Sequence, residues 1–166
     1  IEQPIRQGQW QEMAQLCANT PLPIALDEEL IGVNDFARKN ELLDTIRPQF
    51  IVLKPSLHGA FTGAGEWMAL ARDRNIGYWT TSALESNVGL NAIAQWCAAI
   101  DPQSVMPQGL GTGQLFVENF NEAPLHLEGD MLWYGSKKQR DFLHDIEAFK
   151  DAWQQPSPTM TVHTSG

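Results

Sequence analysis

Five residues with chemically useful groups recur at nearly constant spacing along the chain. Glu2, Asp27, Lys54, Ser82 and Gly109 are separated by 25, 27, 28 and 27 residues. One strand followed by one helix has about this length, so the spacing would carry each residue to the same end of successive parallel strands. Two carboxylates could bind a hard divalent cation, and a nearby lysine could act as a base or hold positive charge. The spacing therefore predicts a metal-assisted enzyme.

Other acids near the second position could also serve as ligands. Glu28 and Glu29 directly follow Asp27, and with 20 acidic residues in the chain any one of them could be a solvated loop acid or a helix cap. Asp27 is favoured because it ends the apolar run Pro23–Leu26, as expected of a residue delivered by a buried strand. Lys54 also follows an apolar run, although a surface lysine that snorkels outward would fit that position too.

A polar cluster and a glycine-rich turn occupy the last two positions. Ser82 and Glu85 are candidates for substrate contact, whereas the adjacent Ser86 or Asn87 could cap the next helix. Three glycines follow at alternate positions, Gly109, Gly111 and Gly113. Because they lack side chains, they permit close approach of the backbone, whose amide hydrogens could hold a carboxylate.

The cysteines and histidines form no recognisable metal or redox motif. Cys17 and Cys97 lie on the apolar faces of expected helices without CxxC spacing, which favours buried free thiols. The 4 histidines lie far apart and lack the i, i+4 pairing of a helical zinc site. We therefore expect them to be incidental to the chemistry.

The elements that must position these residues alternate along the chain. Apolar residues at helical spacing predict helices over 10–17, 36–46, 62–71 and 90–97, with Asn34 and Thr62 as caps of the second and third. Short apolar strands are expected at Pro23–Leu26, Phe50–Leu53 and Ile76–Thr81. This alternation indicates an α/β fold with a parallel sheet. Polar residues after every strand favour a (β/α) barrel over a doubly wound open sheet, whose site lies at one switch point.

The pattern changes after Gly113. The segment Leu125–Tyr134 has strand-like character broken at Gly129, and apolar residues between 142 and 153 have helical spacing. A proline-bearing linker at 154–158 and a short strand-like run at 159–163 follow. We therefore expect a different organisation in the last third of the chain.

Length and charge limit the function classes. The 166 residues fall short of the roughly 250 of a complete barrel, and the chain begins without methionine, so we expect part of a larger protein. A net charge of -9 argues against a nucleic-acid or anionic-membrane partner, which would require clustered lysine and arginine. No apolar run approaches the roughly 20 residues of a membrane span, so we expect a soluble, cytoplasmic protein.

Four segments taken together resemble the enolase superfamily. They are IEQP at 1–4, IALDE at 24–28, IVLKP at 51–55 and TSALES at 81–86. Within the superfamily the likeness is greatest to the o-succinylbenzoate synthases and covers about residues 1–134. The resemblance implies the C-terminal part of a (β/α)7β barrel, incomplete in this chain. It also implies an Mg²⁺-dependent lyase that dehydrates a cyclohexadiene carboxylate to o-succinylbenzoate, on the route to menaquinone.

The resemblance also assigns roles residue by residue. It matches Glu2 and Asp27 to the second and third metal carboxylates, and Lys54 to the sixth-strand lysine whose charge helps to stabilise an enediolate. Ser82 and the Gly109–Gly113 turn resemble segments that contact the substrate. The family's paired-lysine motif, its first metal ligand and its capping domain are absent from this sequence. Because that motif provides the expected base, we predict that this polypeptide alone does not turn over substrate.

The resemblance divides the chain into four parts. Residues 1–113 correspond to the C-terminal half of the barrel, 114–134 to a return segment toward the capping domain, and 135–158 to a helix and linker. The tail, 159–166, resembles the approach to the phosphate loop of adenylate-forming ligases, a class that includes the CoA ligase of the next step. A fusion of synthase and ligase would account for this order, and an ordinary disordered tail is the alternative.

Two other readings of the chain stay open at the level of sequence. N-acylamino acid racemases and dipeptide epimerases of the same superfamily share the metal ligands and both lysine positions. A non-catalytic barrel fragment that acts by association would instead expose sheet edges and apolar helix faces, and would self-associate. A molecular mass that depends on concentration, without metal binding, would favour the fragment.

Overall fold

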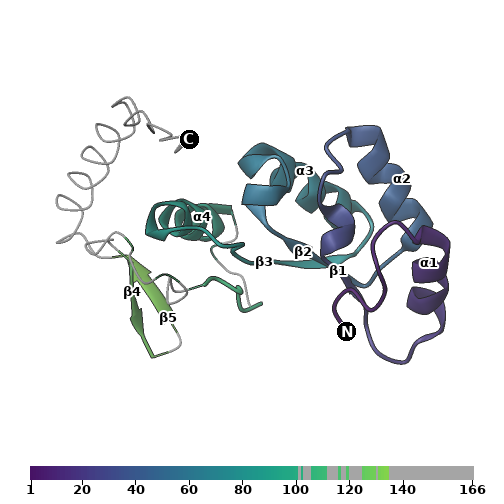
Figure 1. Cartoon of the computed structure of the whole chain (residues 1–166), viewed down its shortest axis with the longest axis horizontal. Helices are drawn as coiled ribbons and strands as arrows, with labels where there is room; N and C mark the ends of the chain where they lie inside the picture. Colours follow the sequence, from purple (N-terminus) through teal and green to yellow (C-terminus); the bar gives the residue numbers. More distant parts are fainter. Residues whose placement is uncertain are drawn as a thin grey trace, which may run out of the picture. The chain divides into compact units, whose positions relative to one another are not determined.

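Strand and helix alternate through the first hundred residues, as the sequence predicts (Figure 1). The computed structural model describes residues 1–100, 102, 106–111, 116, 119, 125–129 and 131–134. The elements of the alternating part are α1 (Trp10–Asn19), β1 (Ala25–Leu26), the 3-10 turn η1 (Glu28–Leu30), α2 (Phe36–Ile46), β2 (Phe50–Leu53), the 3-10 turn η2 (Pro55–Leu57), α3 (Ala60–Asp73), β3 (Gly77–Thr80) and α4 (Asn87–Ile100). The chain divides into two compact units, Ile1–Val117 and Glu118–Gly166.

The first unit contains a parallel sheet in the order β1-β2-β3. Single parallel bridges extend it on both sides, from Glu2 to Ala25 and from Thr81 to Gly109. The sheet therefore has five successive strand positions in chain order, which confirms the architectural period predicted from the sequence.

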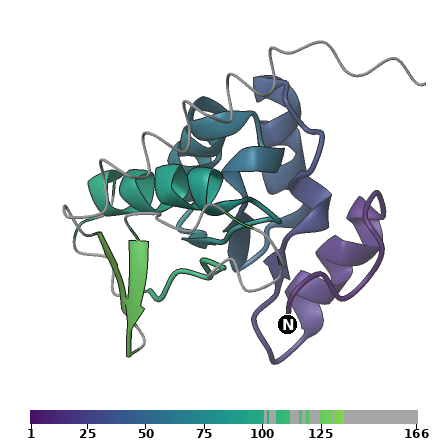
Figure 2. The same ribbon diagram turned by 60° about the vertical axis from the view of Figure 1, so that its left-hand side comes forward.

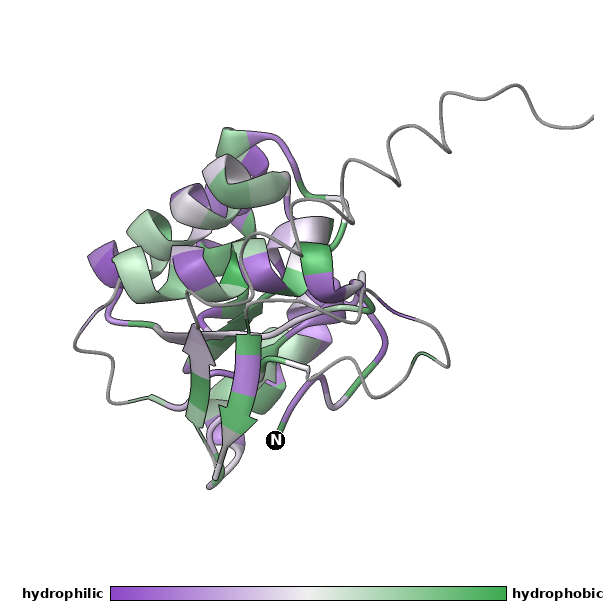
Figure 3. Cartoon of the chain, turned by 90° about the vertical axis from the view of Figure 1, so that its left-hand side faces the viewer, coloured by the Kyte–Doolittle hydropathy of each residue, from purple (hydrophilic) through white to green (hydrophobic). Residues whose placement is uncertain are grey.

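The hydrophobic core lies between the sheet and its helices. Neighbouring helices pack against each other, α1 on α2 and α2 on α3, and α3 also packs on β2 and β3 (Figure 2). The fully buried members of the core cluster include Leu26, Leu42, Leu53 and Trp67. Figure 3 shows green hydrophobic and purple hydrophilic bands in the ribbons of the helices, as expected of elements that bury one face. Both cysteines are buried free thiols, as predicted.

Two predicted helix caps are wrong. The cap of α2 is Asp35, whose side chain accepts a hydrogen bond from the Arg38 amide at 2.8 Å, and not Asn34. Helix α3 begins after Gly59, so Thr62 lies inside the helix. Gly59 has a φ of 82°, a conformation that glycine adopts readily, and this allows the chain to enter the helix three residues earlier.

The expected apolar face of α2 also differs from the observed one. Phe36 was expected on this face but is 52% exposed, because it is the first residue of the helix. The buried positions of α2 are Lys39, Leu42, Leu43 and Ile46. A lysine thus takes a place that the apolar pattern did not assign, and it donates to Glu66 at 2.8 Å and to the Gly63 carbonyl at 3.1 Å.

The described part of the second unit is a hairpin. Strands β4 (Leu125–Glu128) and β5 (Met131–Tyr134) pair in an antiparallel sheet, and Gly129 has a φ of 65° at the turn. The predicted break at Gly129 is therefore confirmed. Gly113, the helix expected at 142–153, the linker at 154–158 and the ligase-like segment at 159–166 lie outside the described residues. No helix in the described part is long and apolar enough to cross a membrane.

Candidate active site

Strand register places the first three candidate residues on the same face of the sheet. Glu2 is bridged to Ala25, and Asp27 stands two residues beyond Ala25, on the same face. Phe50 pairs with Ala25, and Lys54 stands an even number of residues beyond Phe50. The three side chains therefore leave the face opposite the helices. Each lies further along its strand than the previous one, as in the staggered strands of a barrel.

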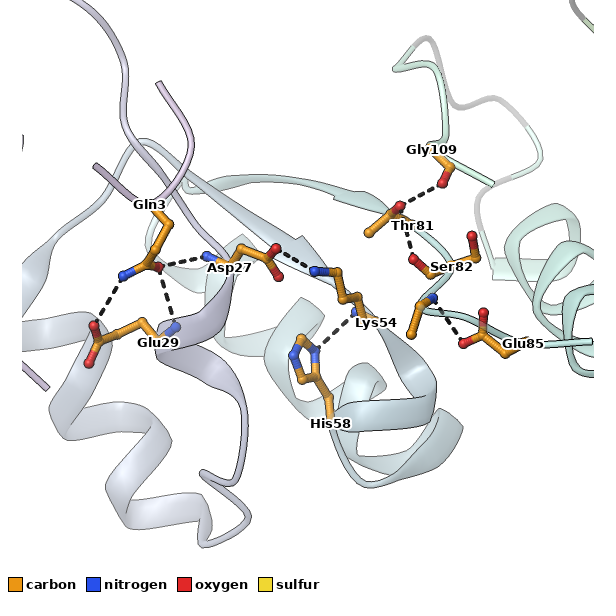
Figure 4. Close-up of polar contacts among 10 residues, drawn as sticks. Gln3, Asp27, Glu29, Lys54, His58, Thr81, Ser82, Glu85 and Gly109 are labelled. Atoms are coloured by element: carbon orange, nitrogen blue, oxygen red, sulfur yellow. Dashed lines mark hydrogen bonds and ion pairs between the residues drawn. The ribbon is translucent and has the colours of Figure 1, made fainter. Parts of the chain in front are cut away.

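Asp27 and Lys54 form a direct ion pair. The Lys54 ammonium donates to Asp27 Oδ2 (Figure 4). The Asp27 side chain is 3% exposed and the Lys54 side chain 19%, so the pair is largely removed from water. A buried carboxylate requires such a partner, because its desolvation is costly. The sequence predicted both residues at this rim but not their contact.

The charge on Asp27 is only partly balanced. Its second oxygen, Oδ1, is buried and has no hydrogen-bond partner among the residues that the structure describes. Although Glu2 is exposed, partial desolvation raises its pKa, the negative charge of Asp27 and a side-chain hydrogen bond with Asp27 raise it further, and Lys54 opposes this increase. Two carboxylates that repel each other, one with an unused oxygen, fit a hard divalent cation.

Two carboxylates alone do not complete such a site. Within the described ranges, no group of three or more histidine, cysteine, aspartate or glutamate residues could hold a metal ion. Water, substrate oxygens or a further carboxylate would have to fill the remaining positions, as is usual for magnesium. Glu2 and Asp27 therefore fit part of a metal site.

Gln3 connects the first strand position to the turn after β1. Its side-chain oxygen accepts hydrogen bonds from the amides of Asp27 at 3.0 Å and Glu29 at 3.3 Å (Figure 4). The Glu29 carboxylate, a competing candidate ligand, is itself engaged: it accepts from the Gly8 amide at 2.9 Å and the Trp10 indole at 2.6 Å. Glu29 therefore fixes the segment that leads into α1, whereas Asp27 has an oxygen without a partner among the described residues.

The fourth and fifth positions are tied to each other. Ser82 Oγ accepts a hydrogen bond from the Gly111 amide at 2.7 Å, and the Gly109 amide donates to the Thr80 carbonyl at 2.8 Å. A Cβ on Gly111 would lie 2.8 Å from Ser82 Oγ, so the glycine allows this close approach. Both glycine amides, which could have held a carboxylate, already donate within the protein.

Glu85 links the two loops that follow β2 and β3. Its Oε1 accepts from the Ser56 hydroxyl at 2.5 Å and the Ala83 amide at 3.0 Å. Its Oε2 is buried without a partner among the described residues. Leu84, next to it, is 72% exposed. Glu85 therefore shapes this edge of the rim whether or not it contacts a substrate.

His58 is a functional candidate that sequence reasoning missed. It is fully buried, and its Nδ1 accepts a hydrogen bond from the Lys54 amide at 3.1 Å. Burial lowers its pKa to about 4, with Lys54 and Lys39 adding to the decrease and Asp27 opposing it. The available signal was its place four residues after Lys54, across a turn that begins at Pro55.

Comparison with known proteins gives a consistent result over the same residues. Residues 1–134 match the family described as "Enolase C-terminal domain-like". An o-succinylbenzoate synthase of Desulfotalea psychrophila is 61% identical over 132 residues, which are 80% of this chain and 35% of that protein. The chain therefore spans about a third of the length of this relative.

Solved structures agree. The crystal structure of MenC from Desulfotalea psychrophila has a TM-score of 0.75 and 61% identity, covering 80% of this chain and 36% of that one. An L-Ala-D/L-Glu epimerase from Bacillus subtilis has a TM-score of 0.65 and 19% identity, with coverage of 80% and 36%. An N-succinyl Arg/Lys racemase from Bacillus cereus has a TM-score of 0.60 and 18% identity, with coverage of 86% and 39%. The likenesses confirm the predicted barrel segment over a doubly wound sheet.

Proposed function

The chain belongs to the enolase C-terminal domain-like family, and from this premise we propose that the full-length protein is an o-succinylbenzoate synthase. It would dehydrate 2-succinyl-6-hydroxy-2,4-cyclohexadiene-1-carboxylate to o-succinylbenzoate. The observation that carries the proposal is the 61% identity to a synthase over the residues that contain the charged rim. The racemase and the epimerase share the fold at 18% and 19% identity, which supports no assignment of substrate.

The chain's own residues suit this reaction. Removal of a proton beside a carboxylate develops negative charge on the carboxylate oxygens, and positive groups fixed nearby lower the barrier. Lys54 supplies such a charge at the end of β2, and its contact with Asp27 keeps the ammonium group at the rim. Glu2 and Asp27 would hold a magnesium ion. When bound, that ion would supply further positive charge to the developing oxyanion.

Ser82, Glu85, Gly109 and Gly111 would shape the substrate side of the rim. Ser82 accepts a hydrogen bond from the Gly111 amide, and Glu85 accepts from Ser56 and Ala83, so that a substrate would meet a preformed wall. We expect the chain of residues 1–166 alone to be inactive, because the family resemblance assigns the acid-base lysine to a strand motif that this sequence lacks.

The test is a magnesium-dependent assay of the full-length protein that follows loss of the cyclohexadiene absorbance. Racemisation of N-acylamino acids is measured in parallel. Dehydration that requires magnesium is the expected result. Racemisation without dehydration would assign the protein to the racemase branch. The absence of both activities would refute an enzymatic role for this rim.

We further infer that the full-length protein carries a ligase domain after residue 166, and that it is cytoplasmic. The resemblance of the tail to an adenylate-forming ligase supports the first inference. A CoA- and ATP-dependent consumption of o-succinylbenzoate by the same purified protein would test it. If sedimentation showed concentration-dependent self-association without magnesium binding, the chain would instead act as an association module.

A further inference from the structure

The position of His58 is fixed by its surroundings. It follows η2, and its amide donates to the Pro55 carbonyl at 3.3 Å. Helix α3 packs directly onto its backbone: a Cβ on Gly63 would lie 1.9 Å from the His58 carbonyl oxygen. The imidazole is fully buried between the end of β2 and the start of α3. His58 therefore cannot swing away from Lys54 without displacing the helix.

The hydrogen bond between the two residues sets the state of the imidazole. The Lys54 amide donates to Nδ1, so Nδ1 carries a lone pair and the ring proton resides on Nε2. Nε2 is buried and has no partner among the described residues. An unpaired buried N–H group is unfavourable, and an apolar side chain would avoid it. The imidazole is therefore not explained by packing alone.

The Lys54 amide needs an acceptor because its neighbouring strand has ended. The Phe50 amide donates to the Ile24 carbonyl of the adjacent strand. The same register would direct the Lys54 amide at Glu28, four residues further on. Glu28, however, is the first residue of η1, and its carbonyl accepts from the Ile31 amide. His58 Nδ1 takes the place of the missing strand neighbour.

We propose that His58 is a positioning residue for Lys54. By accepting the amide of Lys54 just beyond β2, it fixes the backbone from which the side chain leaves, so that the ammonium group meets Asp27 (Figure 4). Gln3 has the corresponding contact with the Asp27 amide. A side-chain acceptor therefore holds the backbone of each member of the ion pair. The catalytic consequence rests on the proposed synthase function, whereas the geometric one does not.

Two variants separate the acceptor from the bulk of the side chain. In His58→Asn, the amide oxygen lies near the position of Nδ1 and can accept the same hydrogen bond. In His58→Leu, the volume is largely kept but the acceptor is lost. In the full-length protein we expect His58→Leu to lower kcat roughly 100-fold, as for a group misplaced by about 1 Å, with KM nearly unchanged. His58→Asn should restore most of kcat. Thermal unfolding of both variants controls for loss of fold.

A spectroscopic measurement tests the geometry without activity. In ¹⁵N-labelled chain, a coupling across the hydrogen bond should join the Lys54 amide nitrogen to His58 Nδ1. The Lys54 ammonium resonance should be sharp in the wild type and in His58→Asn, and broad in His58→Leu. Absence of the coupling would overturn the proposal, as would a His58→Leu variant with unchanged ammonium signal or kcat. If the wild-type protein lacks dehydratase activity, the proposed function fails and these signals still decide the positioning role.

Discussion

The two sides of the rim differ in how their charged groups are arranged. On the Ser82 side, hydroxyl, amide and carbonyl groups pair with each other across the loops after β3. On the Asp27 side, a carboxylate oxygen is left without a partner among the described residues, and the pKa of Glu2 is raised by partial desolvation and by the charge of Asp27. Glu85 Oε2 on the Ser82 side is also buried without a partner among the described residues. The Asp27 side is distinguished by its second carboxylate, Glu2, because an external cation would relieve the repulsion between the two charges. The Asp27 side is suited to holding a cation, and the Ser82 side is suited to shaping the substrate pocket.

The largest expected effect concerns Lys54, the cation that pairs with Asp27. Lys54→Met in the full-length protein should lower kcat by roughly 1,000-fold, because a fixed positive charge at the developing oxyanion is lost. Magnesium affinity should stay the same or increase, because the ammonium no longer competes for Asp27. Kinetics and calorimetric titration of magnesium check the two statements. Arg6→Gln, an exposed residue with the same change in charge, is the control. A parallel loss of magnesium affinity and kcat would contradict the assigned role of Lys54.

The next effect concerns His58, which accepts a hydrogen bond from the Lys54 amide. The pKa of His58 is about 4 in the folded protein, below the ordinary value of 6.5. Between these pH values the unfolded chain binds a proton that the folded chain does not, so the free energy of unfolding falls as the pH falls from 6.5 to 4. The loss is on the order of 3 kcal/mol. When the free energy of unfolding is measured by urea at several pH values in this range, it should change less with pH in His58→Asn than in the wild type. An equal change in both proteins would contradict the assignment.

The smallest effect concerns the contact between Ser82 and Gly111. Gly111→Ala should lower the free energy of unfolding by about 1–3 kcal/mol, because the added Cβ would lie 2.8 Å from Ser82 Oγ. In a Ser82→Ala background the same change should cost less, since the crowding oxygen is gone. A double-mutant cycle measured by urea unfolding gives the coupling. If the two changes are additive, the residues do not depend on each other as the structure indicates.

The period of the sequence predicted the strand positions because it reflects local chemistry. Apolar runs such as Phe50–Leu53 must be buried, and the polar residue that follows must then stand at the strand end. The caps were less predictable: Asp35 and Gly59 are chosen over Asn34 and Thr62 by how each helix meets the sheet, which no short pattern records.

The contacts at the site depended on information beyond spacing. The ion pair between Asp27 and Lys54 follows from the stagger of adjacent strands. A nearly constant spacing of residues in the sequence does not specify that stagger. His58 was missed because its partner is a backbone amide, and the only signal in the sequence was its place four residues after Lys54. Glu85 was predicted at the rim, but its contact with Ser56 depends on the conformation of two loops.

The most direct measurement is a calorimetric titration of magnesium into the full-length protein and two variants. Asp27→Asn removes a charge from the residue with the unused oxygen, and Glu28→Gln removes the same charge from its exposed neighbour. The account predicts that Asp27→Asn weakens binding about 100-fold, equivalent to about 2.8 kcal/mol, and that Glu28→Gln leaves it nearly unchanged. Equal losses in both variants, or no loss in Asp27→Asn, would contradict the claim that the unbalanced side of the rim is a cation site.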